Sequence, residues 1–169
     1  MGDVFRLYLV RHAHAAWAIP GGSDFDRPLD AAGLAEARSV ALQAYTAGFT
    51  PARIVSSPAR RCAETTAAFL DVFGSLWAGY DQQLYSEGME AYLEKIETFM
   101  DGESLMIVGH NPTIETLSKS LAAESEIGAG LAYGFPTAGF FALDFPRQAT
   151  GRLTMHSGVP AALLMPALT

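Results

Sequence analysis

The chain has 169 residues, of which 50% are hydrophobic and 17% are charged. This balance fits a single globular domain over residues 1–169 and excludes an intrinsically disordered chain. The net charge of −7, with 11 Lys and Arg residues and no basic run, disfavours nucleic acid and anionic membranes as partners. The single cysteine excludes an internal disulfide, and no apolar run reaches the roughly 18 residues that span a bilayer. Residues 1–10 do not resemble a secretory signal, so we expect a cytoplasmic protein.

The first third of the chain predicts a strand, a loop and a helix. Phe5–Val10 is short and apolar apart from one arginine, which is typical of a strand buried on both faces. Gly21–Arg27 is rich in glycine and aspartate and predicts a loop. Asp30 is the expected N-cap of a helix that continues to about Gly48. The expected buried face of this helix consists of Leu34, Ala37, Ala41 and Tyr45.

A second strand, a second helix and a further short strand are predicted next. Arg53–Ser56 predicts the second strand. Ser57 followed by Pro58 predicts the start of the helix, with Ser57 as its N-cap. The short strand is predicted over Gln83–Tyr85. The apolar stripe of the helix is expected to contain Cys62, Thr66, Phe69 and Phe73.

The remaining chain continues the alternation of helices and strands. Met89–Met100 predicts a helix, Leu105–Val108 a third core strand, and Asn111–Pro112 the start of another helix. Ala138–Leu143 and Arg152–His156 predict two late strands, paired antiparallel. The buried side of the last helix is expected to contain Ile114, Leu117 and Leu121. Strands alternating with helices predict a three-layer α/β/α sandwich with a mainly parallel central sheet.

The three core strands all run into cationic or imidazole side chains. In a parallel sheet these ends meet at one edge, beyond the carboxyl ends of the strands, where such sheets place their active sites. Arginines and histidines gathered there repel one another by several kcal/mol unless an anion joins them. The three ends are Arg11-His12-Ala13-His14, Ser56-Ser57-Pro58 leading to Arg60-Arg61, and Gly109-His110-Asn111.

A phosphoryl group is the anion that suits these residues. Arginine presents a fork of donors that matches phosphate oxygens, so Arg11 and Arg61 are expected to bind it. A neutral imidazole attacks phosphorus well near neutral pH, which makes His12 the candidate nucleophile. His110 can donate a hydrogen bond to a phosphoryl oxygen in the transition state. This scheme requires no metal ion or other cofactor.

Other residues near these segments have plainer interpretations. Arg60 is expected to be a solvated neighbour, and His156 a structural residue. His14 either borders the site or lies in a partly exposed loop. Cys62 falls on the apolar stripe of its helix, which indicates a core residue rather than a nucleophile.

Four ordered motifs, spread from about residue 5 to about residue 145, resemble those of the histidine phosphatase superfamily, which includes the phosphoglycerate mutases. Alanine replaces the usual glycine after Arg11-His12, as in the small SixA-type phosphohistidine phosphatases. In the register of the third motif the functional arginine is Arg61, not Arg60. The motifs are Leu7–His14 (LYLVRHAH), Asp26–Leu29 followed by Gly33, Ser57–Thr65 (SPARRCAET) and Val108–Pro112 (VGHNP).

The resemblance implies a phosphoglycerate mutase-like fold and a two-step reaction. His12 takes the phosphoryl group, Arg11, Arg61 and His110 bind it, and water then releases phosphate. Larger members of the superfamily carry a glutamate general acid after the second motif. Glu87 in Leu84–Glu87 either takes that role or is simply a residue at the start of a helix.

The substrate follows from what the chain lacks. A short chain without an inserted cap and without a strong acid favours a protein substrate with a good leaving group, such as phosphohistidine. A sugar or nucleotide phosphomonoesterase is the alternative, and a non-catalytic phosphate-binding module is the rival outside enzymes. A phosphoglycerate mutase is disfavoured, because it needs an enclosed site that excludes water and this chain is too short for the covering segments. The oligomeric state is left open, because the apolar tail Val159–Leu168 could pack on its own domain or on a second subunit.

Overall fold

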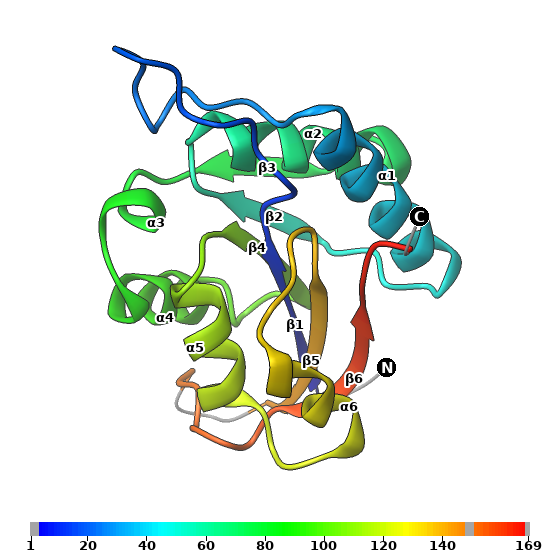
Figure 1. Cartoon of the computed structure of the whole chain (residues 1–169). Coiled ribbons are helices and arrows are strands. Elements are labelled where there is room, and N and C mark those ends of the chain that lie inside the picture. Colours follow the sequence, from blue (N-terminus) through cyan, green and yellow to red (C-terminus); the bar gives the residue numbers. More distant parts are fainter. Residues whose placement is uncertain (1–3, 148–150, 168–169) are drawn as a thin grey trace.

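The computed structural model describes residues 4–147 and 151–167, and in this part of the chain a six-stranded sheet lies between helices (Figure 1). The strand order is β3-β2-β4-β1-β5-β6. The strands are β1 (Val4–Arg11), β2 (Arg53–Ser56), β3 (Trp77–Tyr80), β4 (Ser104–Gly109), β5 (Phe140–Pro146) and β6 (Val159–Leu164).

The sheet is mixed but mainly parallel, as the sequence predicts. β1 pairs with β4, β4 with β2 and β2 with β3, all in parallel. β5 runs antiparallel to both of its neighbours, β1 and β6. The register places Arg11 opposite Gly109 and Ser56 opposite Val108, so the carboxyl ends of β1, β4 and β2 are level.

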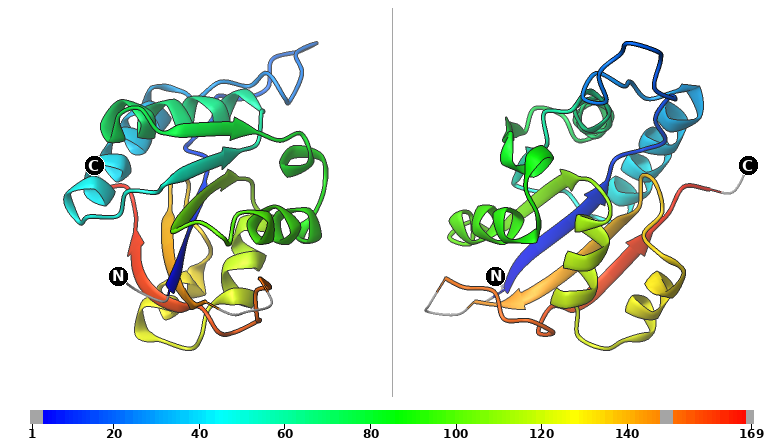
Figure 2. Two further views of the ribbon diagram at one scale, coloured as in Figure 1. Left: turned by 180° about the vertical axis from the view of Figure 1, so that it is seen from behind. Right: turned by 60° about the vertical axis from the view of Figure 1, so that its left-hand side comes forward.

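Helices cover both faces of this sheet, which confirms the three layers (Figure 2). Side chains alternate along each strand because of the two-residue period of a β-strand. Leu7 and Leu9 of β1 therefore join the core beneath α3, α4 and α5, while Tyr8 and Val10 join the core beneath α1 and α2. The helices are α1 (Ala31–Thr46), α2 (Arg60–Phe73), α3 (Gln83–Ser86), α4 (Met89–Thr98), α5 (Thr113–Leu121) and α6 (Glu126–Ala129), with the 3-10 helix η1 (Gly130–Tyr133) before β5. No helix of the described ranges is long and apolar enough to cross a membrane.

Helix α1 confirms its predicted cap but buries a different arc. Asp30 is the N-cap, and its side chain accepts a hydrogen bond from Gly33 N at 2.8 Å. The prediction that Leu34 and Tyr45 are buried is wrong, because they are 52% and 55% exposed. The buried arc is centred to one side of them and consists mostly of small residues, which let the helix approach the sheet closely. These residues are Gly33, Ala37, Val40, Ala41 and Ala44.

Helix α2 begins later than predicted. Its N-cap is Ala59, and Ser57 instead accepts a hydrogen bond from Ala59 N at 3.3 Å within the preceding turn. The expected apolar stripe is confirmed at three positions and only partly buried at Phe73. The three confirmed positions are Cys62, Thr66 and Phe69.

The predicted strand at Gln83–Tyr85 is wrong, because this segment belongs to the short helix α3. Asp81 starts that turn by accepting a hydrogen bond from Gln83 N at 2.9 Å. The edge strand is instead Trp77–Tyr80, whose two aromatic residues suit a pleated surface.

The C-terminal strands are also displaced from their predicted positions. The first of them begins at Phe140, two residues after the expected start, and continues to Pro146. Arg152–His156 is not a strand, and His156 has a φ of 56°, which belongs to the left-handed region. Val159–Leu164 forms β6 instead and pairs antiparallel with β5, so the tail packs on its own domain as far as Leu164. Leu168 lies outside the described residues.

Candidate active site

The structure brings His12, Arg61 and His110 together at the carboxyl edge of the sheet. His12 follows β1 directly, and its backbone N–H donates to Gly109 O of β4 at 3.0 Å. The rings of His12 and His110 lie edge to face, with 5.3 Å between their centroids. Arg61 reaches the same place from the first turn of α2, and its Nη2 lies 3.3 Å from His110 Nδ1.

The ring of His12 is held in one tautomer. Its Nδ1 lies 2.7 Å from the backbone oxygen of Ala13. A carbonyl oxygen can only accept, so Nδ1 carries the proton and Nε2 keeps its lone pair. Burial, followed by the charges of Arg61 and Arg11, lowers the pKa of His12 to about 4. His12 is therefore a neutral imidazole at pH 7, as a nucleophile requires.

Arg61 is a buried cation at the centre of the site. Only 6% of the residue is exposed. Its Nη1 donates to the backbone oxygen of Asp24 at 2.7 Å, and its Nη2 donates to Asp24 Oδ2 at 3.1 Å. These contacts fix the guanidinium beside the two histidines.

His110 has the opposite tautomer to His12. Since arginine only donates, His110 Nδ1 accepts from Arg61, and the proton lies on Nε2. Nε2 then donates to Ser57 Oγ at 2.8 Å, which explains why Ser57 does not cap α2. Burial, followed by His12 and Arg61, lowers the pKa of His110 to about 3. Cys62 Sγ packs 3.4 Å from Nε2, and burial raises the pKa of that thiol to about 12, so it stays protonated.

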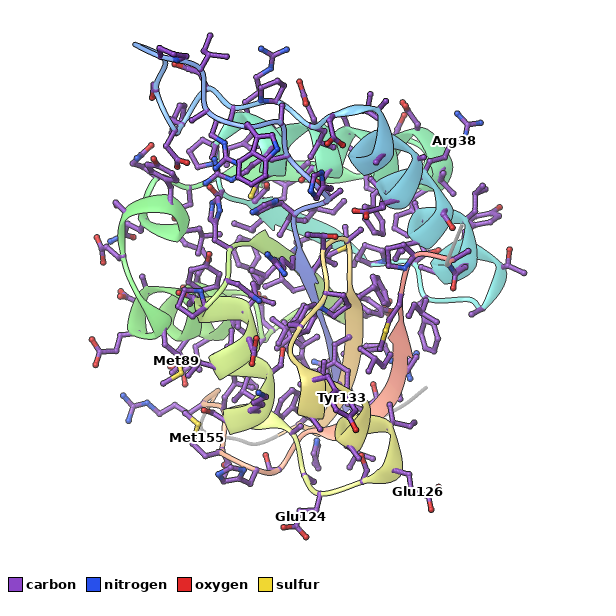
Figure 3. The ribbon with its side chains drawn as sticks, viewed as in Figure 1. Arg38, Met89, Glu124, Glu126, Tyr133 and Met155 are labelled. Carbon is purple, nitrogen blue, oxygen red and sulfur yellow. The ribbon has the colours of Figure 1, made fainter. Side chains whose placement is uncertain are left out.

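Arg11 lies at the rim of the site. Its Nη1 donates to Phe135 O at 2.8 Å, and its buried Nε has no partner within the described ranges. Burial lowers the pKa of its guanidinium. Arg11 also lines a pocket of about 530 Å³ with Asn111 and Tyr133. Tyr133 is fully exposed (Figure 3). An anion at the sheet edge would therefore meet two arginines that come from different elements.

Within the segment Asp26–Leu29 with Gly33, the residues Arg27, Leu29 and Gly33 hold the loop that follows His12. Arg27 Nε donates to Ala16 O at 2.9 Å, and Leu29 N donates to the carboxylate of Glu64 at 2.7 Å. A Cβ on Gly33 would lie 1.9 Å from His14 O, so only glycine permits this approach of α1 to the loop. These three residues therefore clamp the backbone beside the nucleophile candidate.

Three other predicted candidates lie outside the cluster of histidines and arginines. His14 is half-exposed, and its Nδ1 pairs with Asp30 Oδ2 at 2.6 Å. Arg60 forms an exposed ion pair with Glu64 at 2.8 Å. Glu87 is exposed between α3 and α4, closes α3 rather than starting a helix, and accepts from Gln83 Nε2 at 3.2 Å.

Asp24 is the site residue that sequence reasoning missed. Its carboxylate accepts from Arg61, from Arg27 Nη1 at 3.0 Å and from the Tyr85 hydroxyl at 3.2 Å. The only sequence signal was an acidic residue in a glycine-rich loop after the first strand. Such a residue is normally solvated, and the path of the loop over the site is not readable from local patterns.

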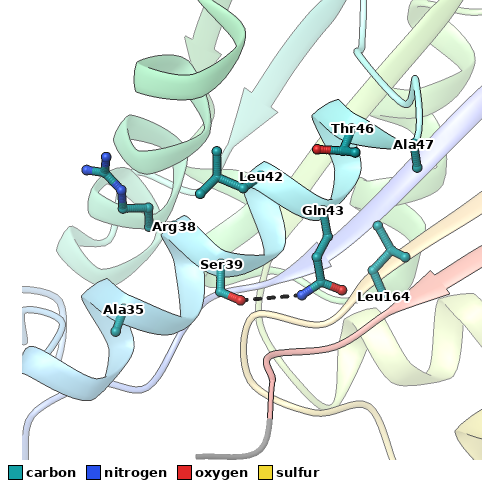
Figure 4. Close-up of a pocket in the computed structure, with 8 residues that line it drawn as sticks. All are labelled: Ala35, Arg38, Ser39, Leu42, Gln43, Thr46, Ala47 and Leu164. Atoms are coloured by element: carbon teal, nitrogen blue, oxygen red, sulfur yellow. Dashed lines mark hydrogen bonds between the residues drawn. The ribbon is translucent and has the colours of Figure 1, made fainter.

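A hollow larger than the one beside Arg11 lies elsewhere on the described surface. It is a groove of about 850 Å³ along α1, where Gln43 Nε2 donates to Ser39 Oγ at 3.4 Å (Figure 4). Its lining is Ala35, Arg38, Ser39, Leu42, Gln43, Thr46, Ala47 and Leu164. It shares no residue with the cluster around His12, so size alone does not locate the chemistry.

The depressed pKa values of the two histidines predict a pH-dependent stability. His12 and His110 titrate near 4 and 3 when folded but near 6.5 when unfolded. The unfolded chain therefore takes up protons first, and stability that is present above pH 6.5 is lost as the pH falls through 4 toward 3. We expect the free energy of unfolding in urea to be lower at pH 5 than at pH 7, and to recover partly with inorganic phosphate. The His110→Asn variant should show a smaller drop, and an equal drop in both proteins would contradict the assignment.

Comparisons with known proteins concern the family and the fold. The family model of the histidine phosphatase superfamily (branch 1) matches residues 7–86. The structure of a candidate phosphohistidine phosphatase, SixA from Agrobacterium tumefaciens, is 38% identical, with a TM-score of 0.84 over 95% of this chain and 97% of that chain. The protein histidine phosphatase SixA, solved with tungstate, is 19% identical with a TM-score of 0.77 over 95% and 97% of the two chains, a likeness of fold alone. An uncharacterised chloroplastic protein of Arabidopsis thaliana is 33% identical over 134 residues, which are 71% of this chain and 60% of that protein.

The fold and these matches define the class of the protein. The chain belongs to the histidine phosphatase superfamily and has the expected phosphoglycerate mutase-like fold. Within the superfamily it belongs to the SixA-type branch. It is therefore a phosphatase and acts on a phosphorylated substrate.

Proposed function

We propose that this chain is a protein phosphohistidine phosphatase that works through a covalent phosphohistidine on His12. The observation that carries the proposal is the state of His12. Its Nδ1 proton is bound to Ala13 O and its pKa is lowered to about 4, so Nε2 offers a lone pair at neutral pH. Arg61 and His110 stand beside it.

The reaction proceeds in two displacements. His12 Nε2 forms a bond to phosphorus, and the bond to the leaving group breaks with its electron pair. Water then attacks the phosphorus, the N–P bond breaks, and both hydrogens of the water remain on the released inorganic phosphate. Arg11 and Arg61 balance the charge of the phosphoryl oxygens. A bound dianion raises the pKa of His110, so that its Nδ1 can gain a proton and donate to a phosphoryl oxygen.

The substrate class is inferred from the leaving group. Hydrogen bonds from Arg27, Arg61 and Tyr85 lower the pKa of Asp24, so the carboxylate nearest to the cluster is ionised at neutral pH and offers no proton. An ester oxygen leaves poorly without a proton, whereas the imidazole of phosphohistidine leaves readily. The SixA-type relatives and the exposed setting of the Asp24 loop also favour a protein substrate.

A comparison of substrates tests this function. Purified enzyme is given a phosphohistidine peptide and, separately, a panel of sugar and nucleotide phosphates, and phosphate release is measured. We expect kcat/KM for the peptide to exceed that for the best metabolite by at least about 100-fold, because only the imidazole leaves without an acid. Preference for a metabolite would instead establish a small-molecule phosphomonoesterase. Phosphate binding without any turnover would establish a binding module.

A further inference from the structure

The carboxylate of Asp24 occupies a place where an anionic substrate must also bind. Asp24 Oδ2 lies 3.1 Å from Arg61 Nη2, which is itself 3.3 Å from His110 Nδ1. A protein that only had to bind phosphate would gain nothing from a fixed negative charge there. At about 4 Å, two unit charges of one sign repel by about 4 kcal/mol at an effective dielectric constant of about 20.

This carboxylate is held in place from several sides. Arg27 Nη1 from its own loop and the Tyr85 hydroxyl from α3 both donate to it. The Tyr85 ring also packs edge to face on Phe25 and on His110, at 5.0 Å and 5.7 Å between centroids. The side chain of Asp24 is nevertheless 53% exposed. It therefore borders the phosphoryl position on one side and open solvent, where a leaving group departs, on the other.

We propose that Asp24 is a specificity residue that binds the protonated nitrogen of a nitrogen-based leaving group and disfavours an oxygen-based one. This inference rests on the proposed phosphohistidine phosphatase function. The ring of phosphohistidine carries phosphorus on one nitrogen and, when protonated, an N–H on the other. That N–H can donate to Asp24 while the phosphoryl group faces His12, so the positive ring separates the two anions.

The step balances without a proton from the enzyme. The lone pair of His12 Nε2 forms the new N–P bond, and the P–N bond of the substrate breaks with its electrons going to the ring. The distal nitrogen keeps its proton, so the substrate histidine leaves as a neutral imidazole, and Asp24 gives up and takes up no proton. An ester leaving group instead departs as an oxyanion and meets the negative charge of Asp24.

The charged and titratable groups facing Asp24 are Arg61 from α2, Arg27 from its loop and Tyr85 from α3. The two arginines and the tyrosine hydroxyl keep the carboxylate ionised over the working range of pH. An ionised carboxylate raises the pKa of the substrate ring that it binds. It thereby extends the reactive, protonated form of the substrate to higher pH.

The Asp24→Asn variant tests this assignment, with Asp26→Asn as the matched control. Asparagine keeps the shape of the side chain, and Asp26 is an exposed acid two residues along the same loop. Steady-state kinetics are measured with a phosphohistidine peptide and with p-nitrophenyl phosphate. In Asp24→Asn, kcat/KM for the peptide should fall about 10- to 100-fold, the worth of a charge-assisted hydrogen bond. The kcat/KM for the aryl phosphate should rise. For the peptide, the alkaline limb of the pH profile of kcat should move to lower pH. The Asp26→Asn variant should leave kcat/KM unchanged for both substrates.

Each other outcome is decisive. If kcat/KM of Asp24→Asn falls equally for both substrates, Asp24 only positions Arg61. If kcat/KM rises equally for both, Asp24 only competes with phosphate. Either result overturns the specificity role. If the wild type hydrolyses the peptide but Asp24→Asn keeps its substrate ratio, this inference alone fails. If the wild type hydrolyses the aryl phosphate but not the peptide, the proposed function fails and takes this inference with it.

Discussion

Replacement of His12 by alanine is expected to lower turnover of an aryl phosphate by at least about 10⁴-fold, because removal of a covalent nucleophile leaves only binding and charge stabilisation. His12 is half-buried and neutral, and its Nε2 is the unprotonated nitrogen of the ring. Steady-state kinetics with the aryl phosphate measure this loss of turnover. Rapid quenching of the wild type with p-nitrophenyl phosphate should trap acid-labile, base-stable phosphate on the protein, and the His12→Ala variant should trap none.

The His14→Ala variant is the control for this experiment. His14 lies two residues along the chain and pairs with Asp30 on a half-exposed surface. Its removal should leave the trapped phosphoenzyme intact and change kcat by less than about 3-fold, since an exposed pair contributes little. Full turnover by His12→Ala, or a phosphoenzyme on another residue, would refute the covalent role.

Replacement of Arg61 by alanine is expected to lower kcat/KM by about 10³-fold, the cost of removing a preorganised group that stabilises transition-state charge. The buried guanidinium contacts both Asp24 and His110, so its loss also leaves an unbalanced carboxylate at the site. Arg61→Lys should recover only part of the activity, because an ammonium group cannot reproduce the planar fork of donors. Kinetics with the aryl phosphate and thermal unfolding of each variant check this result.

Arg60 provides the matched control, since it is an adjacent arginine on the same helix. Its side chain is 57% exposed and pairs with Glu64. We expect Arg60→Ala to retain activity within about 3-fold, because an exposed pair of this kind contributes little. A larger loss in Arg60→Ala than in Arg61→Ala would reverse the assignment of the functional arginine.

The layered fold could be predicted because its signals are local. The short apolar run of β1 predicts a strand buried on both faces, with Leu9 and Val10 in opposite cores, and the cap at Asp30 marks the start of α1. The predictions are wrong where contacts between segments distant in the sequence determine the local structure. Tyr45 is turned outward because small residues of α1 face the sheet, and Val159–Leu164 is a strand because β5 offers its edge.

The sequence by itself determined which residue types stand at the strand ends: His12 after β1 and His110 after β4, with Arg61 in the first turn of the helix that follows β2. Strand order and parallel direction were enough to bring them to one edge. Only the tertiary structure decided the proton positions on the two rings, since Ala13 O fixes one and Arg61 fixes the other. Only the tertiary structure revealed that the Asp24 carboxylate binds Arg61. The loop that carries Asp24 is held by Tyr85, sixty-one residues away, and no local sequence pattern predicts that contact.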